Sequence, residues 1–324
     1  MKGEHRGLVG DVGGTNARLA LVDEDGRIRF PKNYACADFP SLEAVIAEYL
    51  ETTAGRLRPA RAALAVAGPV IDGEIEFTNL SWMVSETELV GAFELEAVSL
   101  INDFAAQALA APLLEEDDLR RIGPELRPAD GCPIAVLGAG TGFGVAGLAR
   151  AGLVDAPLAT EGGHAAFAPE DEVEVEIWRR LKARFGRVSR ERVLSGAGLY
   201  DLYGALGDIE GVSAPLTDEK AVFAAALEGD PLSNRTLDRF CEILGGVAGD
   251  LALTFGARGG VFITGGIAPR MVERLDSGGF RRRFESKGRL SDYVKAIPTT
   301  LIVHPYAALV GAARELKRLE GARL

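Results

Sequence analysis

A pattern of strand, glycine-rich turn and strand occurs twice in the chain, and it constrains the fold more than any other feature. The first copy joins Leu8–Asp11 to Ala17–Asp23 through the turn VGGTN. The second joins Ile134–Leu137 to Gly144–Ala149 through GAGTG. Each copy predicts a β-hairpin whose turn exposes backbone N–H groups that no Cβ atom shields. The repetition predicts two similar halves.

The segments between and after these hairpins alternate between strand and helix patterns, which is typical of an α/β protein. Ser85 and Glu88 have the spacing of a capping box and predict a further helix start. The predicted strands are Arg61–Ala67, Glu74–Thr78, Ala97–Ile101, Val261–Thr264 and Ile297–His304. The predicted helices are Ser41–Thr52, Phe104–Ala110, Pro169–Phe185, Pro231–Phe255, Pro269–Leu275 and Tyr306–Leu319.

Length and charge limit the classes of protein that this chain can be. Its 324 residues suggest about two domains. With 36 basic and 47 acidic residues, the net charge is −11, which argues against a nucleic-acid partner. The three cysteines lie far apart, so neither a disulfide framework nor a zinc cluster is indicated. The uncharged run Pro133–Ala149 is short and rich in glycine, so we expect a cytoplasmic protein with no membrane partner.

The first glycine turn has the residues of a phosphate-binding loop. Successive glycine N–H groups can surround an anion, and the Thr15 hydroxyl adds a donor. Asp11 repels phosphate by itself, but a Mg²⁺ ion between the two, held through water, would explain it. An ordinary hairpin with Gly-Gly is the alternative, although it requires neither the aspartate nor Thr15-Asn16.

The second glycine turn, Gly138–Gly142, offers the same backbone groups from the other half of the chain. Gly142–Gly147 also matches the dinucleotide fingerprint G-x-G-x-x-G, but no helical pattern follows it, so we interpret the match as accidental. The Walker A pattern is absent, which excludes a P-loop enzyme. A third turn, Gly265-Gly266, follows a strand, and close packing or nucleotide contact explains it equally well.

Polar residues gather at three further places. Asn102-Asp103 ends a strand and starts a helix, where α/β sheets place catalytic groups, although Asp103 is also a favoured N-cap. Glu161 and His164 flank two glycines, and their side chains can form hydrogen bonds with the hydroxyl groups of a sugar. The alternative is an ordinary polar turn with a solvated histidine. Glu191 stands at an expected helix start, where an acid also complements the helix dipole. Arg281–Arg283 is expected to be a solvated face.

Taken together, these motifs resemble those of bacterial glucokinases of the type found in enteric bacteria, within the hexokinase, actin and Hsp70-like superfamily. The resemblance covers essentially the whole chain. It rests on LVGDVGGTNARLAL (8–21), TNLSW (78–82), INDF (101–104), PIAVLGAGTGFGVA (133–146), EGGH (161–164), ERVLSG (191–196), GGVFITGGIAPR (259–270) and LIVH (301–304).

The resemblance implies two ribonuclease-H-like α/β domains, as in actin-like ATPases, around a central cleft. It also implies ATP-dependent phosphorylation of D-glucose at the 6-hydroxyl, the first step of glucose use in glycolysis. The small domain would hold residues 1–105 and 305–324, and the large domain residues 106–304. Glucose and ATP with Mg²⁺ are the implied ligands, and a homodimer is the implied assembly.

The resemblance also assigns roles to residues. Asp103 would be the general base. The substrate-binding residues would be Asn79, Asn102, Asp103, Glu161, His164 and Glu191. The ATP-binding residues would be Gly10, Asp11, Val12, Gly13, Gly14, Thr15, Asn16, Gly140, Thr141, Gly265 and Gly266. No protein side chain would bind metal directly, and Mg²⁺ would arrive with ATP near Asp11.

One departure and three alternatives accompany this assignment. ROK-type glucokinases carry a cysteine-rich zinc motif after the sugar-binding histidine, whereas this chain has no cysteine between Cys132 and Cys241, so we expect no structural zinc. A kinase for another hexose or an amino sugar is one alternative. A non-catalytic sugar sensor is a second, which Asp103 argues against. An NAD-dependent oxidoreductase is the third, and it requires a helix beginning at Gly142–Gly147.

Overall fold

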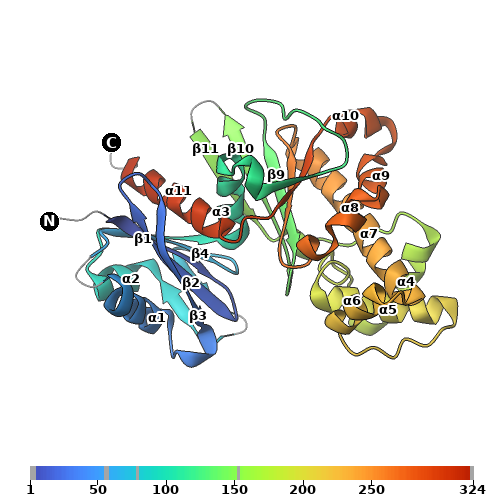
Figure 1. Ribbon diagram of the computed structural model, residues 1–324, viewed down its shortest axis with the longest axis horizontal. Helices are drawn as coiled ribbons and strands as arrows, with labels where there is room; N and C mark the ends of the chain where they lie inside the picture. The colour runs from blue at the N-terminus through green and yellow to red at the C-terminus, as the bar shows by residue number, and fades with distance from the viewer. Residues whose placement is uncertain (1–4, 55–57, 78–79, 152–153, 322–324) are drawn as a thin grey trace. The chain divides into compact units, whose positions relative to one another are not determined.

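The computed structural model describes residues 5–54, 58–77, 80–151 and 154–321 (Figure 1). The chain divides into two compact units. The first takes in Met1–Glu115, Asp155–Thr160 and His304–Leu324. The second takes in Glu116–Val154 and Glu161–Val303.

A five-stranded sheet in the order β3-β2-β1-β4-β7 organises the first unit. Its strands are β1 (His5–Val12), β2 (Asn16–Asp23), β3 (Ile28–Ala35), β4 (Arg61–Val66) and β7 (Ala97–Asn102). The first three run antiparallel, whereas β1, β4 and β7 run parallel. The parallel register aligns Val12 with Val66 and Val66 with Asn102. The carboxyl ends of these three strands therefore share one edge of the sheet.

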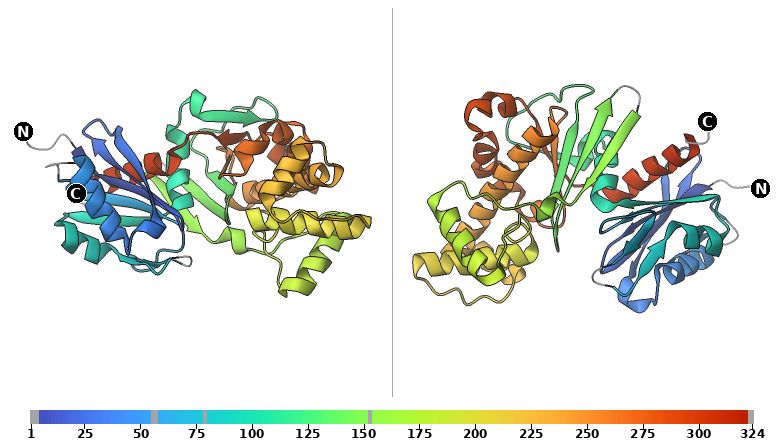
Figure 2. Two further views of the ribbon diagram at one scale, coloured as in Figure 1. Left: turned by 60° about the horizontal axis from the view of Figure 1, so that its bottom comes forward. Right: turned by 180° about the vertical axis from the view of Figure 1, so that it is seen from behind.

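Helices cover both faces of this sheet, as the two orientations in Figures 1 and 2 show. Alternate residues along β1 point to opposite faces, so Leu8 packs with α1 (Leu42–Tyr49) and Val9 packs with α11 (Ala307–Gly321). The helix α2 (Glu86–Phe93) joins α1, and α3 (Asp103–Ala110) joins α11. A Cβ on Gly311 would lie 1.7 Å from the Ala106 carbonyl oxygen, so glycine is what lets α11 approach α3.

The second unit repeats the strand arrangement of the first. Its strands have the order β10-β9-β12-β13-β8. The hairpin β9–β10 is antiparallel, and β9, β12 and β13 are parallel, as β1, β4 and β7 are in the first unit. This repetition confirms the two similar halves that the doubled hairpin predicts. The strands of this unit are β8 (Leu119–Ile122), β9 (Ile134–Ala139), β10 (Phe143–Ala151), β12 (Val261–Thr264) and β13 (Thr299–Ile302). The strand β11 (Val154–Thr160) belongs to the first unit in all but its first residue.

A long helix, α7 (Pro231–Phe255), supplies much of the core of the second unit. Its predicted bounds are confirmed. The Asp230 carboxylate caps its start by accepting the Ser233 N–H at 2.7 Å, and Gly256 ends it in the left-handed conformation. The other helices are α4 (Glu172–Phe185), α5 (Gly196–Glu210), α6 (Glu219–Leu227), α8 (Val272–Asp276), α9 (Gly279–Glu285) and α10 (Ser291–Lys295).

Two local predictions need correction. The helix start predicted at Ser85 is confirmed, because α2 begins at Glu86 with Ser85 as its N-cap, but the Ser85 side chain makes no capping hydrogen bond. The arginine run Arg281–Arg283 is not a solvated face. Arg281 is buried and donates to the Ile297 carbonyl oxygen at 2.8 Å, and Arg283 pairs with the fully buried Glu174.

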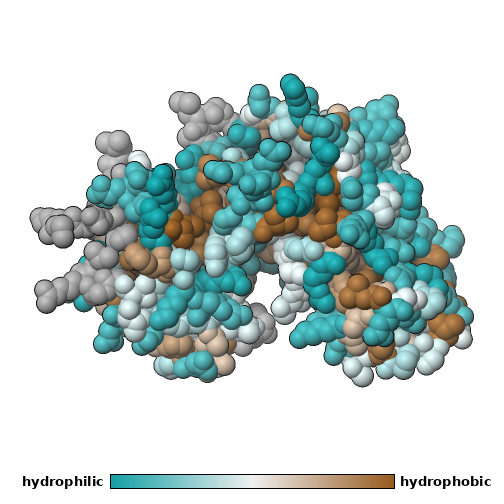
Figure 3. Space-filling view, viewed as in Figure 1, coloured by the Kyte–Doolittle hydropathy of each residue, from teal (hydrophilic) through white to brown (hydrophobic). Residues whose placement is uncertain are grey.

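The surface is largely hydrophilic on the face that Figure 3 shows, with smaller hydrophobic patches between the polar side chains. Within the described ranges, none of the helices is both long and apolar enough to cross a bilayer. A small two-stranded sheet of β5 (Glu74–Glu76) and β6 (Met83–Ser85) completes the described strands.

Candidate active site

The first glycine turn connects β1 to β2 at the carboxyl edge of the first sheet. The Gly13 N–H donates to the Asn16 carbonyl oxygen at 2.9 Å, which closes the turn. The Cys36 N–H donates to the Thr15 carbonyl oxygen at 2.9 Å, and this bond fixes the turn from outside. A Cβ on Gly13 would meet no atom closer than 3.8 Å, so its outer side is open to a ligand.

Two residues of the predicted ATP set face inward instead. A Cβ on Gly10 would lie 2.7 Å from the Leu64 side chain, so this glycine serves the packing of β1 on β4. The side chain of Val12 is fully buried. Both can meet a phosphate only through their backbone.

Asp11 lies on the sheet face that α3 and α11 cover, since it alternates with Gly10 along β1. Its carboxylate pairs with the Arg18 guanidinium across the hairpin at 2.9 Å. Burial raises the pKa of the Asp11 carboxyl, and the Arg18 charge partly opposes this shift. The Arg18 charge thus offsets part of the cost of burying the Asp11 carboxylate.

Asn102 and Asp103 join β7 to α3 at the same edge of the sheet. Asn102 is the N-cap: its side-chain oxygen accepts the N–H groups of Phe104 and Ala105 at 3.0 and 3.1 Å. Asp103 is therefore the first residue of the helix. The alternative interpretation from the sequence, in which Asp103 is the N-cap, is wrong. Its Oδ1 accepts the Phe104 N–H at 2.9 Å and the Asn102 amide at 3.2 Å, which fixes the carboxylate in orientation.

The second and third glycine turns lie side by side in the second unit. The Gly140 N–H donates to the Gly142 carbonyl oxygen at 2.8 Å, much as Gly13 closes the first turn. A Cβ on Gly265 would lie 2.4 Å from the Ala139 carbonyl oxygen, so this glycine lets the turns meet. Gly140 and Gly266 have no atom closer than 3.9 Å in the Cβ direction, so their outer sides are open.

The fingerprint Gly142–Gly147 runs from the glycine turn into strand β10 and opens no helix. Dinucleotide binding through this fingerprint requires a helix that begins there, and none does. The structure therefore contradicts the oxidoreductase alternative.

The turn at Glu161–His164 forms a single 3₁₀ turn, Gly162–His164. The His164 ring lies between two carboxylates, with Nε2 3.9 Å from Glu161 and Nδ1 4.0 Å from Glu191. About half of each of the Glu161 and His164 side chains is exposed, so this group is open to solvent. Carboxylates and an imidazole so arranged offer acceptors and donors to vicinal hydroxyls.

Glu191 links this turn to the second glycine turn. Its N–H donates to the Gly163 carbonyl oxygen at 3.0 Å, and its Oε2 accepts the Phe143 N–H at 2.9 Å. It lies in a turn before α5, whose N-cap is Ser195, and not at the predicted helix start. One carboxylate oxygen is thus held by the backbone of the hairpin, and the other faces His164.

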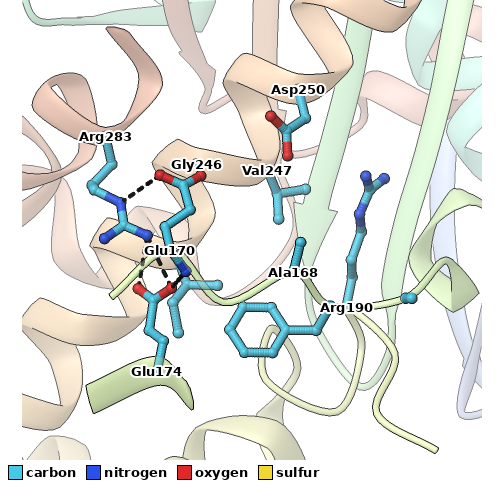
Figure 4. A pocket seen from close by; sticks show the side chains of 11 residues that line it. Ala168, Glu170, Glu174, Arg190, Gly246, Val247, Asp250 and Arg283 are labelled. Carbon is cyan, nitrogen blue, oxygen red and sulfur yellow. Dashed lines mark hydrogen bonds and ion pairs between the residues drawn. The ribbon is translucent and has the colours of Figure 1, made fainter. Parts of the chain in front are cut away.

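Arg190 also holds the Glu161–His164 turn, and no sequence pattern pointed to this residue. Its N–H donates to the Ala165 carbonyl oxygen at 2.9 Å, and its guanidinium lies 3.4 Å from the Gly162 carbonyl oxygen. Figure 4 shows this guanidinium beside the Asp250 carboxylate in a small pocket that Glu170 and Arg283 also line. Burial lowers the pKa of Arg190, and the Asp250 charge opposes that shift.

The remaining residues of the predicted sets lie in the glycine turns or outside the described residues. Asn79, with Thr78, lies outside the described residues. Thr15 and Thr141 are exposed in their turns, and Gly14 and Asn16 complete the first turn. Among the described residues, no group of three or more histidine, cysteine, aspartate or glutamate side chains could hold a metal ion.

Comparisons with known proteins agree with one another. A family model described as "Glucokinase" matches residues 8–319. A glucokinase from Caulobacter sp. (strain K31) is 53% identical over 310 residues, which is 95% of this chain and 94% of the relative. The crystal structure of glucokinase from an Antarctic psychrotroph matches with a TM-score of 0.88 at 40% identity and covers 96% of this chain and 98% of its own.

A more distant solved structure shares the fold alone. The ROK family glucokinase from Streptomyces griseus, in complex with glucose and AMPPNP, has a TM-score of 0.65 at 19% identity. The match covers 96% of this chain and 99% of that one. The actin-like α/β fold that the sequence predicts is confirmed.

Proposed function

The chain belongs to the glucokinase family, and we propose on this premise how its residues carry out the reaction. The chain is a kinase that transfers the γ-phosphoryl group of ATP to the 6-hydroxyl of D-glucose. The observation that best supports the residue assignment is the position of Asp103, oriented at the start of α3 on the sheet edge that also carries the first glycine turn.

Asp103 acts as the general base. Phosphoryl transfer needs a positioned nucleophile and charge neutralisation more than covalent chemistry. The sugar hydroxyl loses its proton to the Asp103 carboxylate as its oxygen bonds to the γ-phosphorus and the β–γ bridge breaks. A base of this kind contributes about 10²–10⁴-fold to the rate. The bonds from Phe104 and Asn102 orient the carboxylate before substrate arrives.

The glycine turns hold ATP. The open sides of Gly13 and Gly140 leave room for phosphate oxygens beside backbone N–H groups, and Gly266 leaves room for the adenosine end. Mg²⁺ bound with ATP would neutralise phosphate charge. Asp11 would hold this ion through water, because its carboxylate is partly buried and already has a cationic partner, Arg18.

The polar group around His164 binds the sugar. Glu161 and Glu191 accept hydrogen bonds from hydroxyl groups, and His164 supplies a further polar contact. Asn102 and Asn79 complete the proposed sugar set.

We assign residues 1–105 and 305–324 to the small domain and residues 106–304 to the large one. We also propose a cytoplasmic homodimer without nucleic-acid or membrane partners.

A coupled assay with a panel of sugars tests the residue assignment. Glucose is expected to give the highest kcat/KM among glucose, mannose, fructose and N-acetylglucosamine. Asp103→Asn is expected to lower kcat about 10²–10⁴-fold while glucose binding, followed by intrinsic fluorescence, changes little. A variant with near-normal kcat would refute the role of Asp103 as base, and a preference for another sugar would refute glucose as the substrate.

A further inference from the structure

A basic groove lies on the first unit at the far end of the sheet from the first glycine turn. It is a cavity of about 400 Å³ between the β2–β3 turn and the outer side of α11. The strand β2 separates the two ends by roughly 25 Å, at about 3.3 Å per residue. The lining residues are Gly26, Arg27, Ile28, Leu113, His304, Val310, Ala313, Arg314 and Lys317.

The polar side chains of this basic groove are all hydrogen-bond donors. Arg27, Arg314 and Lys317 carry positive charge and have no acceptor atoms. The Nδ1 atom of His304 accepts the Tyr306 N–H at 3.0 Å, so in the neutral ring the proton sits on Nε2, which is a donor. None of the lining side chains is a carboxylate, an amide or a hydroxyl.

These cations lack the acidic partners that their neighbours have. Arg29 pairs with Asp23 at 2.8 Å, and Arg318 pairs with Glu315. Within the described ranges, the side chains of Arg27, Arg314 and Lys317 form no ion pair. The nearby acids Glu24 and Asp25 are exposed on the β2–β3 turn and do not line the basic groove. The charges of the three basic side chains are therefore available to an anionic ligand.

The two sides of the basic groove are fixed by packing. Val310, Arg314 and Lys317 follow one another at helical spacing on α11, next to the stripe through Leu309 and Leu316 that packs on the sheet. A Cβ on Gly26 would lie 2.7 Å from the Lys317 Nζ, so the lysine head rests against the β2–β3 turn.

We propose that the basic groove binds a small organic anion, a phosphate ester or a carboxylate with a short carbon chain. Donors without acceptors select a ligand rich in acceptors, and arginine matches the planar or tetrahedral oxygens of carboxylate and phosphate. The side chains of Ile28, Leu113, Val310 and Ala313 supply apolar contact for the carbon chain. The cavity volume is within the range of small-molecule sites.

Isothermal titration calorimetry with two probes tests this proposal. Glycerol 3-phosphate carries the phosphate alone, malate carries carboxylates alone, and glycerol is the neutral control. Saturating glucose and a non-hydrolysable ATP analogue are present, so that the active site does not bind the probes. At least one anion is expected to bind with 1:1 stoichiometry and a Kd of about 1 mM or tighter, and the probe that binds identifies the head group.

Variants locate the binding. Arg314→Gln with Lys317→Gln is expected to weaken it at least tenfold, and Arg27→Gln, on the other side of the basic groove, is expected to weaken it severalfold. Lys220→Gln with Arg289→Gln removes the same charge from exposed positions elsewhere and is expected to leave the affinity unchanged. Unchanged kcat/KM for glucose shows that each variant is folded. No saturable binding of either anion, equal binding of glycerol, or unchanged affinity in the Arg314/Lys317 variant would overturn the proposal.

Discussion

Gly142 is the residue through which the role of Glu191 can be tested without touching Glu191 itself. A Cβ at this position would lie 2.6 Å from the Glu191 Oε2, well inside van der Waals contact. In Gly142→Ala the carboxylate must therefore move, and it loses the hydrogen bond from the Phe143 N–H, now 2.9 Å long. A hydrogen bond to a charged group contributes about 1.5–3 kcal/mol.

That loss sets the size of the expected effect. If the whole of it appears as weaker sugar binding, the KM for glucose rises by roughly tenfold to a hundredfold, since each 1.36 kcal/mol is a factor of ten. The coupled kinase assay measures the KM for glucose and for ATP in the same preparation. The KM for ATP is expected to rise as well, because the same bond holds the second glycine turn.

Gly204→Ala is the matched control. Gly204 lies within α5 of the same unit, and a Cβ there would meet no atom within 4 Å. The substitution is expected to leave both KM values unchanged and to stabilise the helix by up to about 1 kcal/mol. If Gly142→Ala folds and its KM for glucose stays within twofold of the parent value, Glu191 is not held by Phe143 in the way described.

Three further predictions concern other parts of the molecule. Glu161→Gln is expected to raise the KM for glucose about tenfold with a smaller effect on kcat, because a neutral amide accepts a weaker hydrogen bond; an unchanged KM would remove Glu161 from the sugar site. Arg283→Met leaves Glu174, which is 0% exposed, without one of its two arginine partners, and is expected to lower the free energy of unfolding in urea by about 3–5 kcal/mol. The exposed Arg179→Met serves as its control, and equal small losses for both would contradict a buried network. Burial raises the pKa of the Cys241 thiol to about 12, so at pH 8 only about one thiol in 10⁴ is ionised, and iodoacetamide is expected to label it only after unfolding. Rapid labelling of Cys241 in the native state at pH 8, followed by mass spectrometry, would contradict the burial.

Features set by short-range signals could be predicted from the sequence. The bounds of α7 follow from Asp230, Pro231 and Gly256, each of which acts on its own helix end. The two hairpins likewise follow from glycine turns between apolar runs. The capping-box pattern also predicts the start of α2 correctly, although the Ser85 side chain makes no capping hydrogen bond.

Contacts between segments that are distant along the chain could not be predicted from the sequence. Arg283 pairs with Glu174 more than a hundred residues away, so a run of arginines looked like a solvated surface. The site shows the same limit. Glu191 could be named as a candidate, but its bond to Phe143 and the brace from Arg190 depend on how the chain folds back. The sequence also does not distinguish a glycine needed for close packing, such as Gly10, from a glycine whose open side can face a ligand, such as Gly13.

The most direct test of the central claim is a ³¹P NMR spectrum of the reaction with ATP, Mg²⁺ and glucose. The account predicts that the ATP signals give way to ADP and to one new phosphomonoester, coupled to the protons on carbon 6 of the sugar. A phosphomonoester at another hydroxyl, or inorganic phosphate in place of a sugar phosphate, would contradict it.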